Sequence, residues 1–380
     1  MREFLGFLFD NALEIEWQQV VMWFIGGILI FLAVKKNMEP SLLLPMGFGA
    51  ILVNLPLSSA ITQVLSNGQE QEGILNLLFD AGIANELFPL VLFIGIGAMI
   101  DFGPLLSKLM LFGAAAQFGI FFTLGMASLL GFPLKDAASI SIIGAADGPT
   151  SIFVANMLKS DYFSAIMVAA YSYMALVPII QPPVIKLITT KKERMIRMPY
   201  EQKDVSKLTK IMFPIIITII TGIFAPTSVV LIGFLMFGNL IRECGVLDSL
   251  SETAQKVLAN LITIFLGITV ASQMTADKFL RPQTLLILAI GLFAFVFDTV
   301  GGVCFAKILN LFLKKKVNPM IGAAGISAFP MSARVVHKMG LQEDPQNFLL
   351  MHSIGVNVSG QIASVIAGGM ILNIVTPLVG

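Results

Sequence analysis

The sequence predicts an all-α fold of the polytopic membrane class. Hydrophobic residues make up 56% of the chain, charged residues only 12%, and the mean hydropathy is +0.88. Soluble domains carry about 25% charged residues. No soluble domain fits between the long apolar runs. The net charge of +1, without a basic run suited to nucleic acid, gives no reason to expect a nucleic-acid partner.

Ten apolar runs approach the length that a membrane-spanning helix needs, which is about 20 residues. They lie near 18–34, 41–57, 87–100, 105–130, 162–188, 211–225, 228–241, 257–272, 283–313 and 346–366, and a short apolar segment, 368–379, ends the chain. Residues 1–16 predict a short amphipathic helix at the membrane interface rather than a signal peptide, because a basic region followed by a small-residue cleavage site is missing there. The two cysteines, Cys244 and Cys304, predict neither a disulfide framework nor a metal site.

A charged stretch at 191–210 divides the runs into two sets. It holds seven basic and three acidic residues and predicts a solvated linker between two membrane halves, 1–190 and 211–380. The halves share short motifs in the same order: IGAA at 143–146 and 321–324, FIGI at 93–96 and FLGI at 265–268, and FG at 48–49 and 237–238. Each match is weak in so apolar a chain, but the common order favours two repeats of about five spans each.

Loop charges predict that the repeats are inverted. The positive-inside rule places Lys35, Lys36 and the linker in the cytoplasm. Four crossings lie between them if 137–158 re-enters the membrane, so the first half has five crossings. Lys278 and Arg281 fall outside, against the rule. Inverted repeats with interrupted helices are typical of secondary transporters.

Two segments rich in Gly and Pro, 137–158 and 318–338, predict the interrupted helices. We expect them to meet near the membrane midplane. Asp147 lies in the first, among Gly, Pro, Thr and Ser, and an ionisable residue at membrane depth indicates a functional site. Asp147 is therefore a candidate ligand for Na⁺ or H⁺, helped by Thr150 and by main-chain carbonyls freed at the break. The alternative is a loop carboxylate that caps a helix at the water interface.

The second segment offers Asn318, Gly322, Ser327 and Arg334. Asn318 and Ser327 could supply oxygens to a second ion, and Arg334 could bind an anionic group at the cytoplasmic mouth. A close-packed helix interface and a snorkelling Arg334 explain the same pattern equally well.

Three further positions carry polar groups within apolar runs. Asn357 fits an ion ligand or an interhelical hydrogen bond. Tyr171 and Tyr173 fit an aromatic interface belt or, if desolvated beside a cation, a proton donor. Asp298 is a further carboxylate in an apolar run, with no assigned role.

Four stretches make the chain recognisable: GAADGPTSIFVANML at 144–158, AAYSYMALVPIIQPP at 169–183, NPMIGAAGISAFPMSARVVHKMGLQEDPQNFLLMH at 318–352, and GVNVSGQIASVIAGG at 355–369. They resemble the β subunit of the biotin-dependent sodium-translocating decarboxylases, the oxaloacetate, methylmalonyl-CoA and glutaconyl-CoA decarboxylase pumps. The resemblance extends over most of the chain. The short N-terminal region leaves open which of the three types it resembles.

The resemblance implies a translocase subunit that decarboxylates carboxybiotin, exports Na⁺ and consumes a proton. Its essential Asp matches Asp147, and its proton-donor Tyr matches Tyr173. Its other functional residues match Asn318, Gly322, Ser327, Arg334 and Asn357.

The resemblance also implies the setting of this subunit. The biotin is not bound covalently here but arrives on a biotin carrier protein or domain. The other partners are a carboxyltransferase α subunit, which chooses the acyl substrate, and a small γ/δ membrane subunit. The expected assembly is a homotrimer with an elevator-like scaffold and core, in a bacterial or archaeal cytoplasmic membrane. Two alternatives from other classes are a Na⁺-coupled carboxylate symporter without decarboxylation and a passive membrane anchor, and the anchor does not explain Asp147.

Overall fold

The fold is almost entirely helical, as the sequence predicts. The computed structural model describes residues 15–64, 68–100, 110–198, 205–224 and 226–379. Most of the predicted interfacial helix at 1–16 lies outside these residues. Long apolar runs become helices because lipid offers no hydrogen-bond partner, so the main chain must pair within itself. The chain folds into two compact units, which are described separately.

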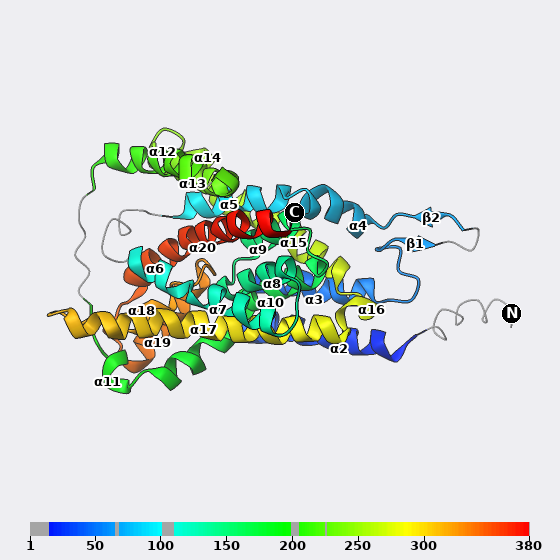
Figure 1. The fold of residues 1–380 in the computed structure, drawn as a ribbon, viewed down its shortest axis with the longest axis horizontal. Helices are drawn as coiled ribbons and strands as arrows, with labels where there is room; N and C mark the ends of the chain where they lie inside the picture. Colours follow the sequence, from blue (N-terminus) through cyan, green and yellow to red (C-terminus); the bar gives the residue numbers. More distant parts are fainter. Residues whose placement is uncertain (1–14, 65–67, 101–109, 199–204, 225, 380) are drawn as a thin grey trace. The chain divides into compact units, whose positions relative to one another are not determined.

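The first unit combines the described residues of Met1–Pro89 with Asn260–Ile287. Its elements are α2 (Trp17–Lys36), α3 (Pro40–Val53), the β1–β2 hairpin (Gln63–Val64 and Glu70–Gln71), α4 (Ile74–Phe79), the π-helical turn η1 (Asp80–Ala84), most of α15 (Ala259–Val270), η6 (Ala271–Gln273), α16 (Ala276–Phe279) and the start of α17 (Pro282–Phe312) (Figure 1).

Small residues and one asparagine hold this unit together. Gly26 of α2 and Gly47 of α3 face each other so closely that a Cβ on either would collide with the main chain of the other. The Asn54 side chain donates to the carbonyls of Ala50 (2.7 Å) and Met274 (2.8 Å). It also accepts from the N–H of Ala276 at 2.7 Å, so it joins the end of α3 to the start of α16.

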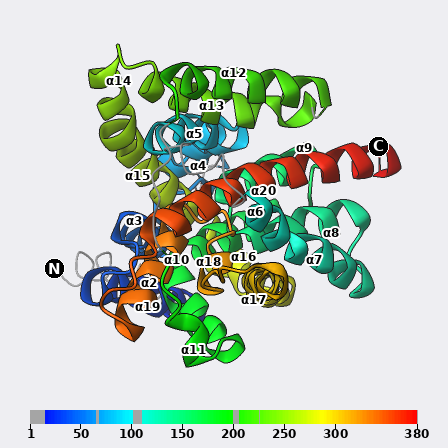
Figure 2. The ribbon, with the colours of Figure 1, turned by 90° about the vertical axis from the view of Figure 1, so that its left-hand side faces the viewer.

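The second unit combines the described residues of Leu90–Ala259 with Leu288–Gly380. Its elements are most of α5 (Leu87–Met99), α6 (Met110–Ala116), α7 (Phe118–Leu129), α8 (Leu134–Ser141), η3 (Ile142–Ala145), α9 (Gly148–Met157), α10 (Phe163–Ile188), α11 (Lys191–Arg194), α12 (Lys207–Phe224), η4 (Pro226–Ser228), α13 (Val229–Glu243), α14 (Asp248–Glu252), η5 (Thr253–Leu258), most of α17, α18 (Met320–Ala323), α19 (Met331–Glu343) and α20 (Leu350–Val379). Helix α20 packs against α6, α8 and α9 (Figures 1 and 2).

Six helices of the described chain are long and apolar enough to cross a membrane. They are Trp17–Lys36, Leu111–Leu129, Phe163–Ile188, Asp248–Gln273, Pro282–Phe312 and Leu350–Val379. The helices Ile74–Ala84 and Leu87–Met99, bent by 60°, add a seventh if they form one span. The chain is therefore a multi-pass membrane protein.

One predicted boundary is wrong. The runs 346–366 and 368–379 form one continuous helix, α20, rather than two segments. Gly368 and Gly369 lie inside this helix, where they permit close packing. A Cβ on Gly368 would crowd Thr150, and one on Gly369 would collide with Ser228.

The described part of the charged linker is docked rather than loose. Arg194 of α11 pairs with Glu343 at 2.7 Å, and Arg197 pairs with Asp344 at 2.5 Å. Arg194 also donates to the carbonyl of Thr189 at 2.6 Å. Residues 191–198 therefore contact the end of α19 through these ion pairs, while Lys191, Lys192 and Arg197 remain exposed to solvent.

Both interrupted segments are broken as predicted. The first breaks at Ala146, which has a left-handed φ of 50°, and helix α9 then restarts with Gly148 and Pro149. The second breaks between the end of α18 at Ala323 and the start of α19 at Met331.

Candidate ion site

Asp147 is buried at the first break, with 2% of its surface exposed. It is the N-cap of α9, and its Oδ1 accepts from the N–H of Thr150 at 3.2 Å. Proline is favoured in the first helical turn because its fixed φ suits the helix and its missing N–H has no partner there, so Gly148-Pro149 sets this geometry. The positive end of the α9 dipole then points at the carboxylate.

Three further donors converge on Oδ2 of Asp147. They are the hydroxyl of Thr150 (2.8 Å), the hydroxyl of Ser364 (2.6 Å) and the amide of Gln361 (2.9 Å). Within the described chain, no Lys, Arg or His forms an ion pair with Asp147. An ionised carboxylate buried without a compensating charge costs several kcal/mol. The arrangement is therefore suited to holding a proton or a cation.

The second break lies directly against the first. The N–H of Ser327 donates to the carbonyl of Ala145 at 2.8 Å, and the Ser327 hydroxyl donates to the carbonyl of Gly360 at 3.0 Å. The amide of Asn357 donates to the carbonyl of Ile326 at 2.6 Å. Helix α20 thus contacts both breaks, and the predicted meeting of the two segments is found.

Two buried amide oxygens beside the second break have no hydrogen-bond partner in the described part of the chain. One is Oδ1 of Asn357, and the other is Oε1 of Gln117. The Gln117 amide meanwhile donates to the carbonyls of Gly113 (3.1 Å) and Gly325 (3.3 Å). Unpaired carbonyl-type oxygens are ligands that hard cations accept.

Gln181 of α10 bridges the two sides of the second break, and the Ser332 hydroxyl also donates directly to the carbonyl of Ala323 at 3.0 Å. The Gln181 amide donates to the carbonyl of Ala323 at 2.7 Å and to the hydroxyl of Ser332 at 2.8 Å. These two residues flank the break, so α10 fixes the distance between α18 and α19. Gly322 serves packing, because a Cβ there would collide with the main chain of Gly302 on α17.

Asn318 lies apart from the Asp147 group. Its amide donates to the carbonyls of Arg194 (2.8 Å) and Ile196 (2.9 Å), and its Oδ1 accepts from the N–H of Met320 at 3.0 Å. Asn318 therefore anchors the 191–198 segment. Arg334 is exposed on α19.

The two tyrosines of α10 face different neighbours. Tyr173 packs against Gly291 of α17, and its hydroxyl donates to the carbonyl of Leu288. Tyr171 packs against Gly148, next to Asp147, and its buried hydroxyl has no partner among the residues that the structure describes. Tyr171 is thus the tyrosine nearer to the first break.

Asp298 is a second fully buried carboxylate. Its oxygens lie against Gly119 in the first turn of α7 and against Gly144 just before the first break. The main-chain N–H groups of Gly119 and Ile120 approach these oxygens, which have no other hydrogen-bond partner in the described residues.

Sequence reasoning missed Gln361 and Ser364. A signal was present, because Asn357, Gln361 and Ser364 are four and three residues apart, a spacing that puts them on one face of a helix. The sequence alone does not tell which break this face contacts.

The fold and the site define a class: a multi-pass membrane protein in which two broken helices meet at a buried carboxylate. Comparison with known proteins is more specific. Residues 18–375 match the family model of the Na⁺-transporting oxaloacetate decarboxylase beta subunit, and the chain belongs to this family.

The relatives include all three decarboxylase types. The chain is 44% identical to a probable oxaloacetate decarboxylase beta chain of Vibrio cholerae, over 99% of this chain and 100% of the relative. It is 48% identical to the methylmalonyl-CoA decarboxylase subunit beta of Veillonella parvula, over 97% and 94%. It is 47% identical to the glutaconyl-CoA decarboxylase subunit beta of Acidaminococcus fermentans, over 94% of each chain. The chain is therefore a membrane subunit of a Na⁺-pumping decarboxylase.

Proposed function

We propose that this chain decarboxylates carboxybiotin and couples the reaction to Na⁺ export, with one proton consumed. The observation that carries the proposal is Asp147, a buried carboxylate with four hydrogen-bond contacts and no cationic partner in the described chain. Na⁺ binding there supplies the missing charge. The hydroxyls of Thr150 and Ser364 keep lone pairs that can turn toward the ion.

A second group of oxygens supports a further Na⁺ position. The group consists of Asn357, Ser327 and the main chain around Gly322. Gln117 joins it because its side-chain oxygen is buried beside the second break without a partner in the described chain. Asn318 contributes by anchoring the 191–198 segment rather than as a direct ligand, since its Oδ1 already accepts from the N–H of Met320 and its NH₂ group is bonded to the carbonyls of Arg194 and Ile196.

The chemical step needs an anion site and a proton. When the bond between the biotin ureido nitrogen and the carboxyl carbon breaks, CO₂ leaves and the nitrogen takes a proton. Arg334, exposed on α19, is suited to attract the carboxylate from the cytoplasmic side. Tyr173 is the proposed proton donor, and its hydroxyl bond to Leu288 fixes its orientation. The biotin arrives on a carrier protein or domain, with a carboxyltransferase α subunit and a small γ/δ subunit as the other partners.

Inverted repeats are part of this proposal, and two helix crossings support them. In the first unit, Gly49 of α3 packs on Ile268 near the end of α15 and on Ala271 at the start of η6. In the second unit, Gly238 of α13 packs on Ile94 of α5. Both crossings involve the matched motifs. The FG motif of the first half (48–49) packs on the FLGI motif of the second half (265–268), and the FG motif of the second half (237–238) packs on the FIGI motif of the first half (93–96). Such reciprocal packing is expected when each half contributes equivalent helices. Alternating access, an elevator-like motion and a homotrimer in a bacterial or archaeal cytoplasmic membrane complete the proposal.

The decisive experiment uses the reconstituted complex in sealed vesicles. CO₂ release from a carboxybiotinylated carrier and uptake of radioactive Na⁺ are measured together, with and without Na⁺. We expect CO₂ release to require Na⁺ and uptake to require carboxybiotin. Na⁺-driven movement of a carboxylate without CO₂ release would instead identify a symporter.

A further inference from the structure

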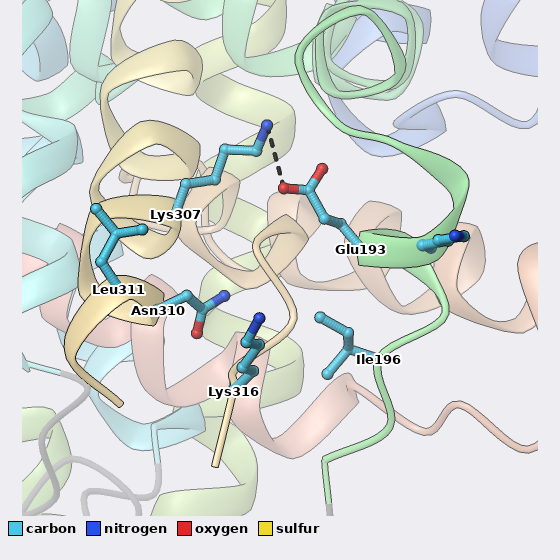
Figure 3. Close-up of a pocket in the computed structure, with 7 residues that line it drawn as sticks. Glu193, Ile196, Lys307, Asn310, Leu311 and Lys316 are labelled. Carbon is cyan, nitrogen blue, oxygen red and sulfur yellow. Dashed lines mark ion pairs between the residues drawn. The ribbon is translucent and has the colours of Figure 1, made fainter. Parts of the chain in front are cut away.

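A basic pocket of about 350 Å³ lies at one end of α17, away from the Asp147 group. It is lined by Lys192, Glu193, Ile196, Lys307, Asn310, Leu311 and Lys316 (Figure 3). Three lysines and one glutamate give the lining an excess of positive charge. All of these residues belong to the second unit.

The single acidic group of the pocket is already compensated. Lys307 pairs with Glu193 at 3.2 Å, as the dashed line in Figure 3 shows, and donates to the carbonyl of Ile188 at 2.8 Å. Burial raises the pKa of Glu193, but the hydrogen bonds from Thr190 and Lys307 outweigh it and hold the pKa below its usual value. Glu193 therefore stays ionised, and the charge of Lys307 is compensated by this ion pair.

Lys192 and Lys316 remain available for a ligand. Neither forms an ion pair with any residue that the structure describes. The loop that carries Lys316 is fixed, because the Asn310 side chain both donates to and accepts from the main chain of Val317, at 2.8 Å each. The lining of the pocket therefore includes two lysines without an ion pair in the described chain, and the main chain beside one of them is held in place.

The rim of the pocket is apolar and faces outward. Leu311 lines the pocket and is 80% exposed, as is Phe312 beside it. Both lie at the end of α17. This helix has 31 residues, whereas about 20 residues are enough to cross a bilayer. Charged groups beside exposed apolar side chains at a helix end match the boundary between headgroups and acyl chains.

We propose that this pocket binds a phosphate group, and that the phosphate belongs to an anionic phospholipid. The free lysines recognise the phosphate, and Leu311 and Phe312 contact the acyl chains. Basic pockets between membrane helices on the cytoplasmic side are suited to such headgroups.

The test measures ligand binding to the full-length chain in detergent. The probes are short-chain phosphatidylglycerol, short-chain phosphatidylcholine and inorganic phosphate, and the variant is Lys192→Gln/Lys316→Gln. We expect phosphatidylglycerol affinity to fall about 25-fold, since each lysine near an anionic lipid contributes about a factor of five. The control Lys35→Gln/Lys36→Gln, at the end of α2, changes equally many charges and should leave binding unchanged.

A second variant separates the two sources of phosphate. Leu311→Ser should weaken phosphatidylglycerol and leave inorganic phosphate unaffected. If inorganic phosphate binds as tightly as the lipid, and both depend on the two lysines, the site takes phosphate from solution. Equal binding of phosphatidylcholine, or full phosphatidylglycerol affinity in the double variant, overturns the proposal.

Discussion

The N–H of Ser327 donates to the carbonyl of Ala145 at 2.8 Å, so the two helix breaks are joined main chain to main chain. Helix α20 adds a second connection, because Gln361 donates to Asp147 and the carbonyl of the preceding Gly360 accepts from the Ser327 hydroxyl. Through α20, two hydrogen bonds therefore connect Asp147 to the second break. Under the proposed function, this short path is the route by which Na⁺ binding at Asp147 would be coupled to a movement at the second break.

Asp147→Asn should abolish Na⁺-dependent decarboxylation and Na⁺ uptake. An amide cannot neutralise the ion. If its oxygen takes the place of Oδ2 and keeps the donors from Thr150, Ser364 and Gln361, its NH₂ group faces the N–H of Thr150, at a cost of about 1–3 kcal/mol. Both activities are measured in vesicles, with the amount of inserted protein as reference. The control is Asp136→Asn, a buried position whose Oδ1 accepts from Ser160 and Asp161 and would still do so. Normal Na⁺ coupling in Asp147→Asn would remove this residue from the ion site.

Ser364→Ala should raise the Na⁺ concentration for half-maximal activity about tenfold, with the maximal rate restored by excess Na⁺. The variant loses one neutral oxygen and one hydrogen bond to the carboxylate, and hydrogen bonds to charged groups contribute about 1.5–3 kcal/mol. Activity against Na⁺ concentration is the measurement. Ser353→Ala, a buried serine on the same helix whose hydroxyl has no partner in the described residues, should behave as wild type. A lower maximal rate at unchanged Na⁺ affinity would assign Ser364 to folding or chemistry.

The variants Ser327→Ala and Asn318→Ala should have different effects: the first on Na⁺ affinity, and the second on the anchoring of residues 191–198. Ser327→Ala keeps the N–H bond to Ala145 and loses an oxygen near the second break, so the half-maximal Na⁺ concentration should rise severalfold. Asn318→Ala removes the donor to Arg194 and Ile196, so it should loosen residues 191–198 without a matching change in Na⁺ affinity. Hydrogen exchange of the segment and Na⁺ titration are compared for both. An equal shift in Na⁺ affinity would return Asn318 to the ligand group.

Much of the site could be predicted from the sequence, because breaks leave a local signature. Gly148-Pro149 beside Asp147 marks the first break, and the Gly and Pro residues of 318–338 mark the second. The donors on α20 could not be assigned, since their partner lies more than 200 residues away and only packing brings them together. The sequence suggests a free oxygen at Asn318, whereas in the structure its Oδ1 accepts from the N–H of Met320 and its NH₂ group donates to the carbonyls of Arg194 and Ile196. The pair Gly368-Gly369 suggests a helix end, but the close approach of Thr150 and Ser228 is what these glycines permit.

Tyr173→Phe should lower turnover strongly, and more steeply at high pH, because bulk water supplies a proton less readily there. The ring packing on Gly291 is kept and only the hydroxyl bond to Leu288 is lost. Tyr171→Phe is the matched control, since its ring packing on Gly148 is also kept. Turnover from pH 6 to 9 is measured for both variants. A steep pH-dependent loss in Tyr171→Phe, with Tyr173→Phe near wild type, would transfer the proton-donor role to Tyr171.

The ion pair of Arg197 and Asp344 should keep residues 191–198 docked at neutral pH and release them in acid. Hydrogen bonds from the Arg197 guanidinium and the Gln346 N–H lower the pKa of Asp344 below its usual 3.8. A lowered pKa in the folded state means that the stabilisation is present above the unfolded pKa and is lost as pH falls through the lower folded pKa. Asp344→Asn should therefore speed hydrogen exchange of 191–198 at pH 7, and the difference from wild type should vanish well below pH 3.8. The control Glu252→Gln removes an exposed ion pair with Lys256 and should leave the segment unchanged. Identical exchange of wild type and Asp344→Asn at pH 7 would mean that Arg194 and Asn318 hold the segment without this pair.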